Sequence, residues 1–164
     1  MILEEHLETT VKAHDQQLHR RVDLLLRTGK LLVESLADTN RIVRNMKRTA
    51  AYLGIPEEML HINVSFTMLM VNVSDGDYSF TKCQRIEGHG VNMTAISEIS
   101  KLSWRAIETD YTLDQYEEEL EKIRKKKRNY TPWQVAIGAG FACGGFCIQF
   151  GCDWVAFLYA SIAA

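Results

Sequence analysis

Four side chains near the middle of the chain have the types and spacing that acid–base chemistry uses. Asp75 and Asp77 lie in the polar segment Ser74–Asp77, and Arg85 and His89 follow shortly after it. Two carboxylates, a guanidinium and an imidazole in one pocket could serve a hydrolase as general acid, general base and anion anchor. The structural alternative is that both aspartates form a turn and that Arg85 is a solvated strand residue. We take this alternative as the first interpretation.

The standard signatures of catalysis and metal binding are absent from the sequence. It contains no phosphate-binding glycine loop, no His-Glu-x-x-His zinc motif and no Gly-x-Ser-x-Gly nucleophile elbow. The four cysteines, Cys83, Cys143, Cys147 and Cys152, include no Cys-x-x-Cys pair. We therefore predict no metal, no cofactor and no enzymatic activity, and we keep a membrane-tethered hydrolase as an alternative.

Charged residues are divided unevenly along the 164 residues, although the net charge is only −2. All 19 Lys and Arg precede residue 130, and Asp153 is the only charged residue after that point. A protein that binds nucleic acid through its overall charge has an excess of cations, which this chain lacks. We expect no nucleic-acid partner, and we expect two parts with different surroundings, residues 1–129 and residues 130–164.

The segment from Thr131 to Phe150 has the length and composition of a membrane helix. Its 20 residues carry no charge, and as a helix they would extend about 30 Å, the thickness of the hydrocarbon core of a bilayer. Six of the seven residues from Lys122 to Arg128 are basic, which by the positive-inside rule would keep residues 1–129 in the cytoplasm. The sequence therefore predicts a transmembrane helix at about 131–150, with a buried core helix as the alternative.

A second apolar segment begins at Trp154 and reaches Ala164. Eleven residues would cross only about half of a bilayer, so we expect a chain that is truncated within a second membrane helix. In the first segment Gly140 and Gly144 have the small-residue spacing by which membrane helices pack closely. The alternative is that small residues are simply common in membrane helices.

Residues 1–129 alternate between helical and strand-type patterns. Apolar residues at spacings of three and four from Leu7 to Leu25 predict a long first helix, in which Gly29 is either a close-packing point or a break. Alternation from Ile62 to Met68 predicts a strand, and residues 69–73 either continue it or form a second one. Further predicted elements are a hairpin partner at 78–86 and helices after Asp38, Asn92 and Thr112. The predicted fold class is α+β, a small antiparallel sheet enclosed by helices.

The order of these features resembles the threonine/serine exporter family of bacterial inner-membrane proteins, including its split relatives linked to dicarboxylate export. The resemblance covers roughly residues 20–164. It departs from the family at Leu36, where a small Gly is usual, and at His89, where an Arg is often found. The segments that carry it are Gly29–Leu32, Glu34-Ser35, Ala37–Thr39, Arg41-Ile42, Ala51–Gly54, Asp75-Gly76, Arg85-Ile86, Gly90–Met93, Tyr130–Trp133 and Asp153-Trp154.

The resemblance implies the N-terminal part of a secondary exporter of small amino acids (threonine or serine) or small organic acids. It implies a location in the bacterial inner (plasma) membrane, a cytoplasmic N-terminal domain, and the lipid bilayer and substrate as partners. A second small membrane subunit, or a homo-oligomer, would complete the bundle. An interaction module that holds a membrane partner is the alternative to transport. The motif residues whose role the resemblance leaves open are Glu34, Thr39, Arg41, Arg85, Gly90, Asn92 and Asp153.

Overall fold

The computed structural model describes the backbone of residues 2–74, 78–126 and 130–163, and side chains from Gln16 onward. The chain divides into two compact units, Met1–Lys125 (unit 1) and Lys126–Ala164 (unit 2). Helices together with an antiparallel sheet confirm the predicted α+β class.

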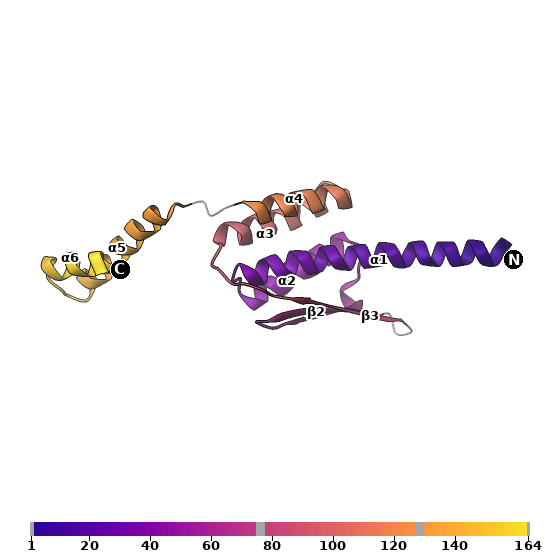
Figure 1. The fold of residues 1–164 in the computed structure, drawn as a ribbon, viewed down its shortest axis with the longest axis horizontal. Coiled ribbons are helices and arrows are strands. Elements are labelled where there is room, and N and C mark those ends of the chain that lie inside the picture. Colours follow the sequence, from indigo (N-terminus) through magenta and orange to yellow (C-terminus); the bar gives the residue numbers. More distant parts are fainter. Residues whose placement is uncertain (1, 75–77, 127–129, 164) are drawn as a thin grey trace. The chain divides into compact units, whose positions relative to one another are not determined.

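Unit 1 has three layers, with the sheet on one side, α1 and α2 in the middle, and α3 and α4 on the other side (Figure 1). The helix α1 is central because it contacts the sheet as well as the other three helices. The elements of unit 1 are α1 (Ile2–Glu34), α2 (Thr39–Tyr52), a short 3-10 helix (Glu57–Met59), β1 (Leu60–Val64), β2 (Met68–Ser74), β3 (Ser79–Arg85), α3 (Met93–Glu108) and α4 (Leu113–Lys125).

The three strands form an antiparallel sheet in the order β1-β2-β3. The predicted strand at 62–68 is corrected, because a turn separates β1 from β2, with Val64 paired to Leu69 and the Ser65 amide donating to the Met68 carbonyl at 2.9 Å. The turn changes which residues face the helices. Leu69 and other β2 residues of its parity are buried, whereas Phe66 and Met68 are exposed.

Gly29 is a close-packing point and not a break, because α1 continues to Glu34. A Cβ at position 29 would lie 2.5 Å from Leu69 Cδ2 and 2.7 Å from Met46 Sδ. The absence of a side chain therefore lets α1 approach β2 and α2 together. The predicted role of Leu7 in the core lies outside the described side chains, whereas Leu25 is fully buried as predicted.

A small polar network lies inside the helical layers around Tyr116, which is fully buried. Its hydroxyl lies 3.3 Å from Thr28 Oγ1 and 3.2 Å from Thr49 Oγ1, so it links α1, α2 and α4. Thr28 also donates to the Leu24 carbonyl at 2.9 Å, and the Tyr116 ring stacks on Tyr52. Burial raises the pKa of Tyr116.

We expect Tyr116→Phe to lower the free energy of unfolding by about 1–2 kcal/mol at neutral pH, because two buried threonine hydroxyls lose a partner. A raised pKa in the folded state means that the unfolded chain loses its phenolic proton first. Stability therefore falls as the pH rises above about 10. Urea denaturation between pH 8 and 11 would show this decline in the native chain and a weaker one in the variant. An identical alkaline decline in both proteins would contradict the account.

The end of α1 adopts a turn that normally favours glycine. Leu36 has a φ of 57°, its amide donates to the Val33 carbonyl at 3.0 Å, and the Ala37 amide donates to the Leu32 carbonyl at 3.1 Å. This pair of hydrogen bonds is a Schellman motif, whose left-handed position is usually Gly. Leu36 is therefore a strained residue at a position that glycine would occupy without strain.

Leu36→Gly is expected to stabilise unit 1 by about 0.5–1 kcal/mol, because glycine adopts the left-handed conformation without a Cβ penalty. Leu36→Ala is the matched control, since it removes the side chain but keeps the Cβ. In thermal denaturation the melting temperature of Leu36→Gly should be higher than that of Leu36→Ala and that of the unchanged protein. A Leu36→Gly variant no more stable than Leu36→Ala would be inconsistent with strain at this turn.

Unit 2 is a pair of helices, α5 (Pro132–Gln149) and α6 (Trp154–Ala163). A capping box between Thr131 and Gln134 begins α5, with Gln134 Oε1 accepting from the Thr131 amide at 3.0 Å. The two helices touch where the small-residue spacing predicted a contact. A Cβ at Gly140 would lie 2.7 Å from the Ser161 carbonyl oxygen, and one at Gly144 would collide with Phe157.

The predicted transmembrane helix at 131–150 is corrected by the structure. A helix forms there, but among the described residues no helix combines the length and the apolarity needed to cross a membrane. The cause lies in the composition of α5. Its 18 residues are long enough, but Gln134, Gln149 and several glycines lower its mean hydropathy. The predicted second membrane helix is corrected as well, because the segment forms the 10-residue helix α6, which is too short to cross a membrane.

Candidate functional site

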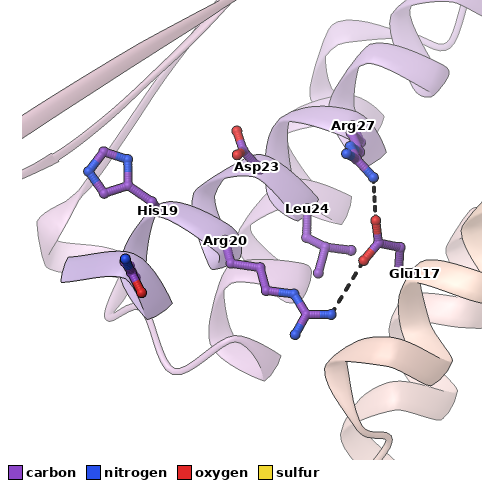
Figure 2. Close-up of a pocket in the computed structure, with 7 residues that line it drawn as sticks. His19, Arg20, Asp23, Leu24, Arg27 and Glu117 are labelled. Atoms are coloured by element: carbon purple, nitrogen blue, oxygen red, sulfur yellow. Dashed lines mark hydrogen bonds and ion pairs between the residues drawn. The ribbon is translucent and has the colours of Figure 1, made fainter. Parts of the chain in front are cut away.

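Two pockets of unit 1 are candidate sites, and both include Arg27 of α1. The first has a volume of about 380 Å³ and contains Arg20, Arg27 and Glu117. Figure 2 shows the two arginines reaching toward Glu117 of α4 from different turns of α1. Its remaining lining residues are Gln16, His19, Asp23 and Leu24.

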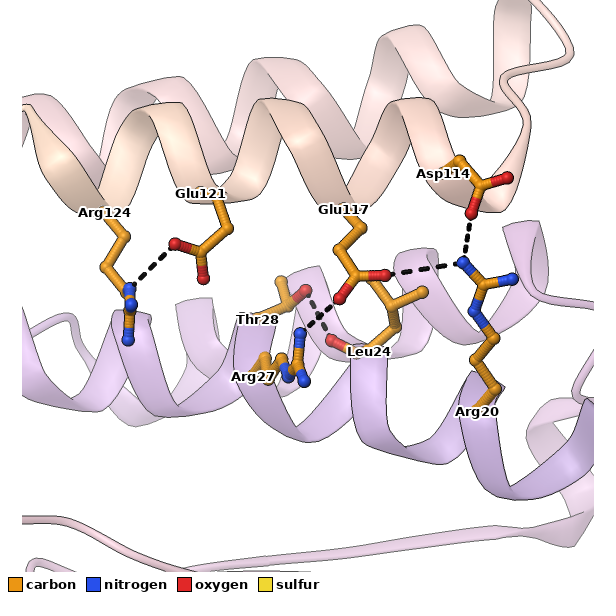
Figure 3. A network of polar contacts seen from close by, with 8 residues as sticks. All are labelled: Arg20, Leu24, Arg27, Thr28, Asp114, Glu117, Glu121 and Arg124. Carbon is orange, nitrogen blue, oxygen red and sulfur yellow. Dashed lines mark hydrogen bonds and ion pairs between the residues drawn. The ribbon is translucent and has the colours of Figure 1, made fainter. Parts of the chain in front are cut away.

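Ion pairs join α1 to α4 along this surface (Figure 3). Glu117 accepts from Arg27, and from Arg20 at 3.5 Å. Arg20 also pairs with Asp114, and this pairing raises the pKa of Arg20. Because the side chains are between one third and four fifths exposed, water screens the pairs and each contributes little to stability. Their arginines are thus available to exchange a carboxylate of the protein for one of a ligand.

The second pocket has a volume of about 430 Å³ and lies between α1, α4 and the sheet side of the unit. It combines cations with carboxylates, since Lys30 lies 3.6 Å from Glu34 and Arg124 lies 3.2 Å from Glu121. A volume of this size suits a small molecule. Guanidinium and ammonium groups bind carboxylates, and carboxylates bind ammonium groups. The full lining is Arg27, Lys30, Leu31, Glu34, Gln84, Glu87, Leu120, Glu121 and Arg124.

Three of the motif residues meet at the end of α1. The Gly90 amide donates to the Glu34 carbonyl at 2.8 Å, and the Asn92 amide donates to the Ser35 carbonyl at 3.2 Å. The Asn92 side chain also caps α3 by accepting from the Ala95 amide at 3.0 Å. These contacts fasten the loop before α3 to α1. Of the three, Glu34 also lines the second pocket.

The other motif residues do not join a common pocket. Thr39 begins α2 beside its cap Asp38, which accepts from the Arg41 amide at 3.4 Å. Arg85 is exposed at the end of β3. Asp153 precedes α6 in unit 2 and its carbonyl accepts from the Phe157 amide at 3.1 Å. Thr39, Arg41 and Asp153 thus lie at helix starts. Neither these three residues nor Arg85 line either of the two pockets described above.

The suggested hydrolase cluster is not assembled by the described residues. Arg85 pairs with Met68 at one end of the β2–β3 hairpin, and Ser79 pairs with Ser74 at the other. Six residues of strand separate these ends by about 20 Å. His89 instead stacks on Phe66 with ring centroids 3.8 Å apart. The predicted contributions of Asp75 and Asp77 lie outside the described residues, and the described residues contain no group of metal-ligating side chains.

Sequence reasoning missed the charged pockets between α1 and α4. Arg20 and Arg27 are seven residues apart and share a helix face, which the sequence could have shown. Their partner Glu117 lies 90 or more residues away. Only the packing of α4 beside α1 reveals that these charges meet.

A charged, pocketed α+β unit followed by a pair of apolar helices defines a class of protein with one polar and one apolar part. The sequence profile of the family described as "Putative threonine/serine exporter" matches residues 23–164. The chain belongs to this threonine/serine exporter family, as the resemblance indicated.

A curated relative is Pheromone-regulated membrane protein 10 of Pichia sorbitophila. It is 26% identical over 159 residues, which cover 94% of this chain and 15% of that relative. The chain therefore spans 15% of the length of the curated relative it matches. No solved structure matches the chain.

Proposed function

We propose that this chain is the N-terminal part of a secondary exporter of threonine, serine or small organic acids. The family match over residues 23–164 carries the proposal. In secondary transporters the substrate site lies between helices near the middle of the membrane. The two helices of unit 2, neither of which combines the length and apolarity to cross a membrane, would pack at the edge of such a bundle, to which a second small membrane subunit or further copies of the chain would also contribute.

The surface of unit 2 supports a location in an apolar environment. Large apolar side chains of unit 2 are exposed to an unusual degree, with Trp133 of α5 at 74%, the α5 C-cap Phe150 at 83% and Ile162 of α6 at 82%. An exposed surface of this kind marks contact with lipid or with other apolar helices. We propose that unit 2 lies in the bacterial inner membrane. The basic run from Lys122 to Arg128 then favours a cytoplasmic unit 1.

We propose that unit 1 collects substrate at the second pocket. A zwitterionic amino acid has a carboxylate for Arg27 or Lys30 and an ammonium group for Glu34. A dicarboxylate would use the cations alone. This role requires no enzymatic step, and the proposal replaces the hydrolase alternative because the described residues do not bring Arg85 and His89 into a pocket.

Efflux from cells that express the full-length protein tests the proposal. Cells loaded with labelled threonine, serine or a small dicarboxylate should lose at least one of them faster than cells without the protein. Arg27→Gln should raise the substrate concentration that half-saturates efflux about tenfold, because the substrate carboxylate loses one charge-assisted hydrogen bond. Lys101→Gln, a change at an exposed lysine of α3, should have no effect. Equal efflux with and without the protein would refute the proposal.

A further inference from the structure

One end of unit 1 has an exposed apolar surface that its core does not use. We name the side chains Leu36, Phe66, Met68, Val91 and Met93 the end surface. Their exposed fractions range from 43% for Leu36 to 67% for Phe66. Large apolar side chains gathered on a surface mark a site of interaction.

The loop at 86–92 brings these side chains together. At its start the Ile86 amide donates to the Thr67 carbonyl at 3.0 Å, beside Phe66 and Met68. His89 then stacks on Phe66. The hydrogen bonds from Gly90 and Asn92 to the end of α1 place Val91 beside the turn that contains Leu36, and Met93 follows at the start of α3.

Basic groups lie at the same end of the unit. Arg124, in the last turn of α4, lines the second pocket together with Glu34 and Glu87, which belong to the end of α1 and to the loop. Lys125 and Arg85 form no ion pair within the described residues. The same pocket holds three carboxylates, Glu34, Glu87 and Glu121, of which Glu34 pairs with Lys30 and Glu121 with Arg124. The sequence continues from Lys125 with three more basic residues, Lys126, Lys127 and Arg128.

We propose that the end surface binds the surface of an anionic lipid bilayer. Apolar side chains beside lysine and arginine fit such a surface, because the side chains enter the headgroup region while the cations face anionic headgroups. A protein partner or a second copy of the chain would need an acidic surface to match these cations. In unit 1 the carboxylates between α1 and α4 are already engaged in ion pairs with Arg20 and Arg27. The proposal rests on the membrane location proposed above, and it does not depend on the substrate.

Flotation of residues 1–129 with vesicles tests this binding. The fragment can be used because unit 1 has a core of its own, whose buried apolar side chains, among those that the structure describes, lie between Val22 and Ile123. It should bind vesicles that contain phosphatidylglycerol and should not bind vesicles of phosphatidylcholine alone. Phe66→Ser should lower the partition coefficient about tenfold, and Lys125→Gln about fivefold.

Each kind of substitution has a matched control, Ile107→Ser for the apolar changes and Lys101→Gln for the change of a lysine. Met93→Ser should weaken binding, whereas Ile107→Ser, at the other end of α3 and 44% exposed, should not. Lys101→Gln should bind as the unchanged fragment does, and circular dichroism should show every variant folded. Equal binding to both kinds of vesicle, no binding, or normal binding by Phe66→Ser would overturn the proposal. Self-association that Phe66→Ser abolishes, without lipid binding, would overturn it as well.

The two proposals fail in different ways. Lipid binding by residues 1–129 together with absent efflux would remove the exporter function and leave the lipid-binding surface. Efflux by the full-length protein together with absent lipid binding would remove the lipid-binding surface and leave the exporter function.

Discussion

Gly29→Val is expected to lower the free energy of unfolding of unit 1 by about 3 kcal/mol, at the upper end of the usual cost of overpacking. Even the first atom of the new side chain would lie 2.5 Å from Leu69 Cδ2 and 2.7 Å from Met46 Sδ. Both neighbours are fully buried, so they cannot move into solvent. The helix must shift away from β2 and α2, which loosens the centre of the core.

Urea denaturation of residues 1–129 measures this effect, and Met46→Ala supplies the control. Alone, Met46→Ala should cost about 2–5 kcal/mol because it leaves a cavity. In the double variant the valine fills part of that cavity, so the combined cost should be smaller than the sum of the single costs. Strict additivity would show that position 29 does not press on Met46.

The second large effect is expected at Gly144. A Cβ there would meet the Phe157 ring at 2.5 Å and also the Ser161 hydroxyl, so Gly144→Ala should separate α5 from α6. We expect a loss of about 1–3 kcal/mol in the stability of the helix pair. Gly145→Ala is a control at the next residue, because nothing lies within 4 Å of its added Cβ.

Limited proteolysis of the full-length protein in detergent would follow the α5–α6 pairing. The connection at residues 150–153 should be cleaved faster in Gly144→Ala than in Gly145→Ala, which should resemble the unchanged protein. Equal cleavage of the two variants would argue against close packing at Gly144.

Local sequence signals predicted most of the fold. The helix predicted after Asp38 is confirmed as α2, and Asp38 caps it by accepting from the Asn40 amide at 3.0 Å. The helix predicted after Thr112 is confirmed as α4, which begins with reciprocal hydrogen bonds of 3.0 and 3.3 Å between Thr112 and Gln115. Such caps and the helical periodicity act within a few residues, so a sequence displays them directly.

The strand boundary and the site required information that a local pattern lacks. The alternation from Ile62 to Met68 continues through a turn, and only pairing with β2 decides that Phe66 lies outside the sheet. The pocket between α1 and α4 depends on contacts such as Arg27 with Glu117. The predicted membrane helix illustrates a third limit, since the absence of charge alone did not establish the mean apolarity that crossing a membrane requires.

Transport by the purified full-length protein in vesicles is the most direct test of the proposed exporter. Vesicles loaded with labelled threonine, serine or a small dicarboxylate should release one of these substrates faster than protein-free vesicles. Release should saturate as substrate concentration rises, and Arg27→Gln should shift that saturation while Lys101→Gln leaves it unchanged. Release no faster than from protein-free vesicles, for all of these substrates, would contradict the proposed function.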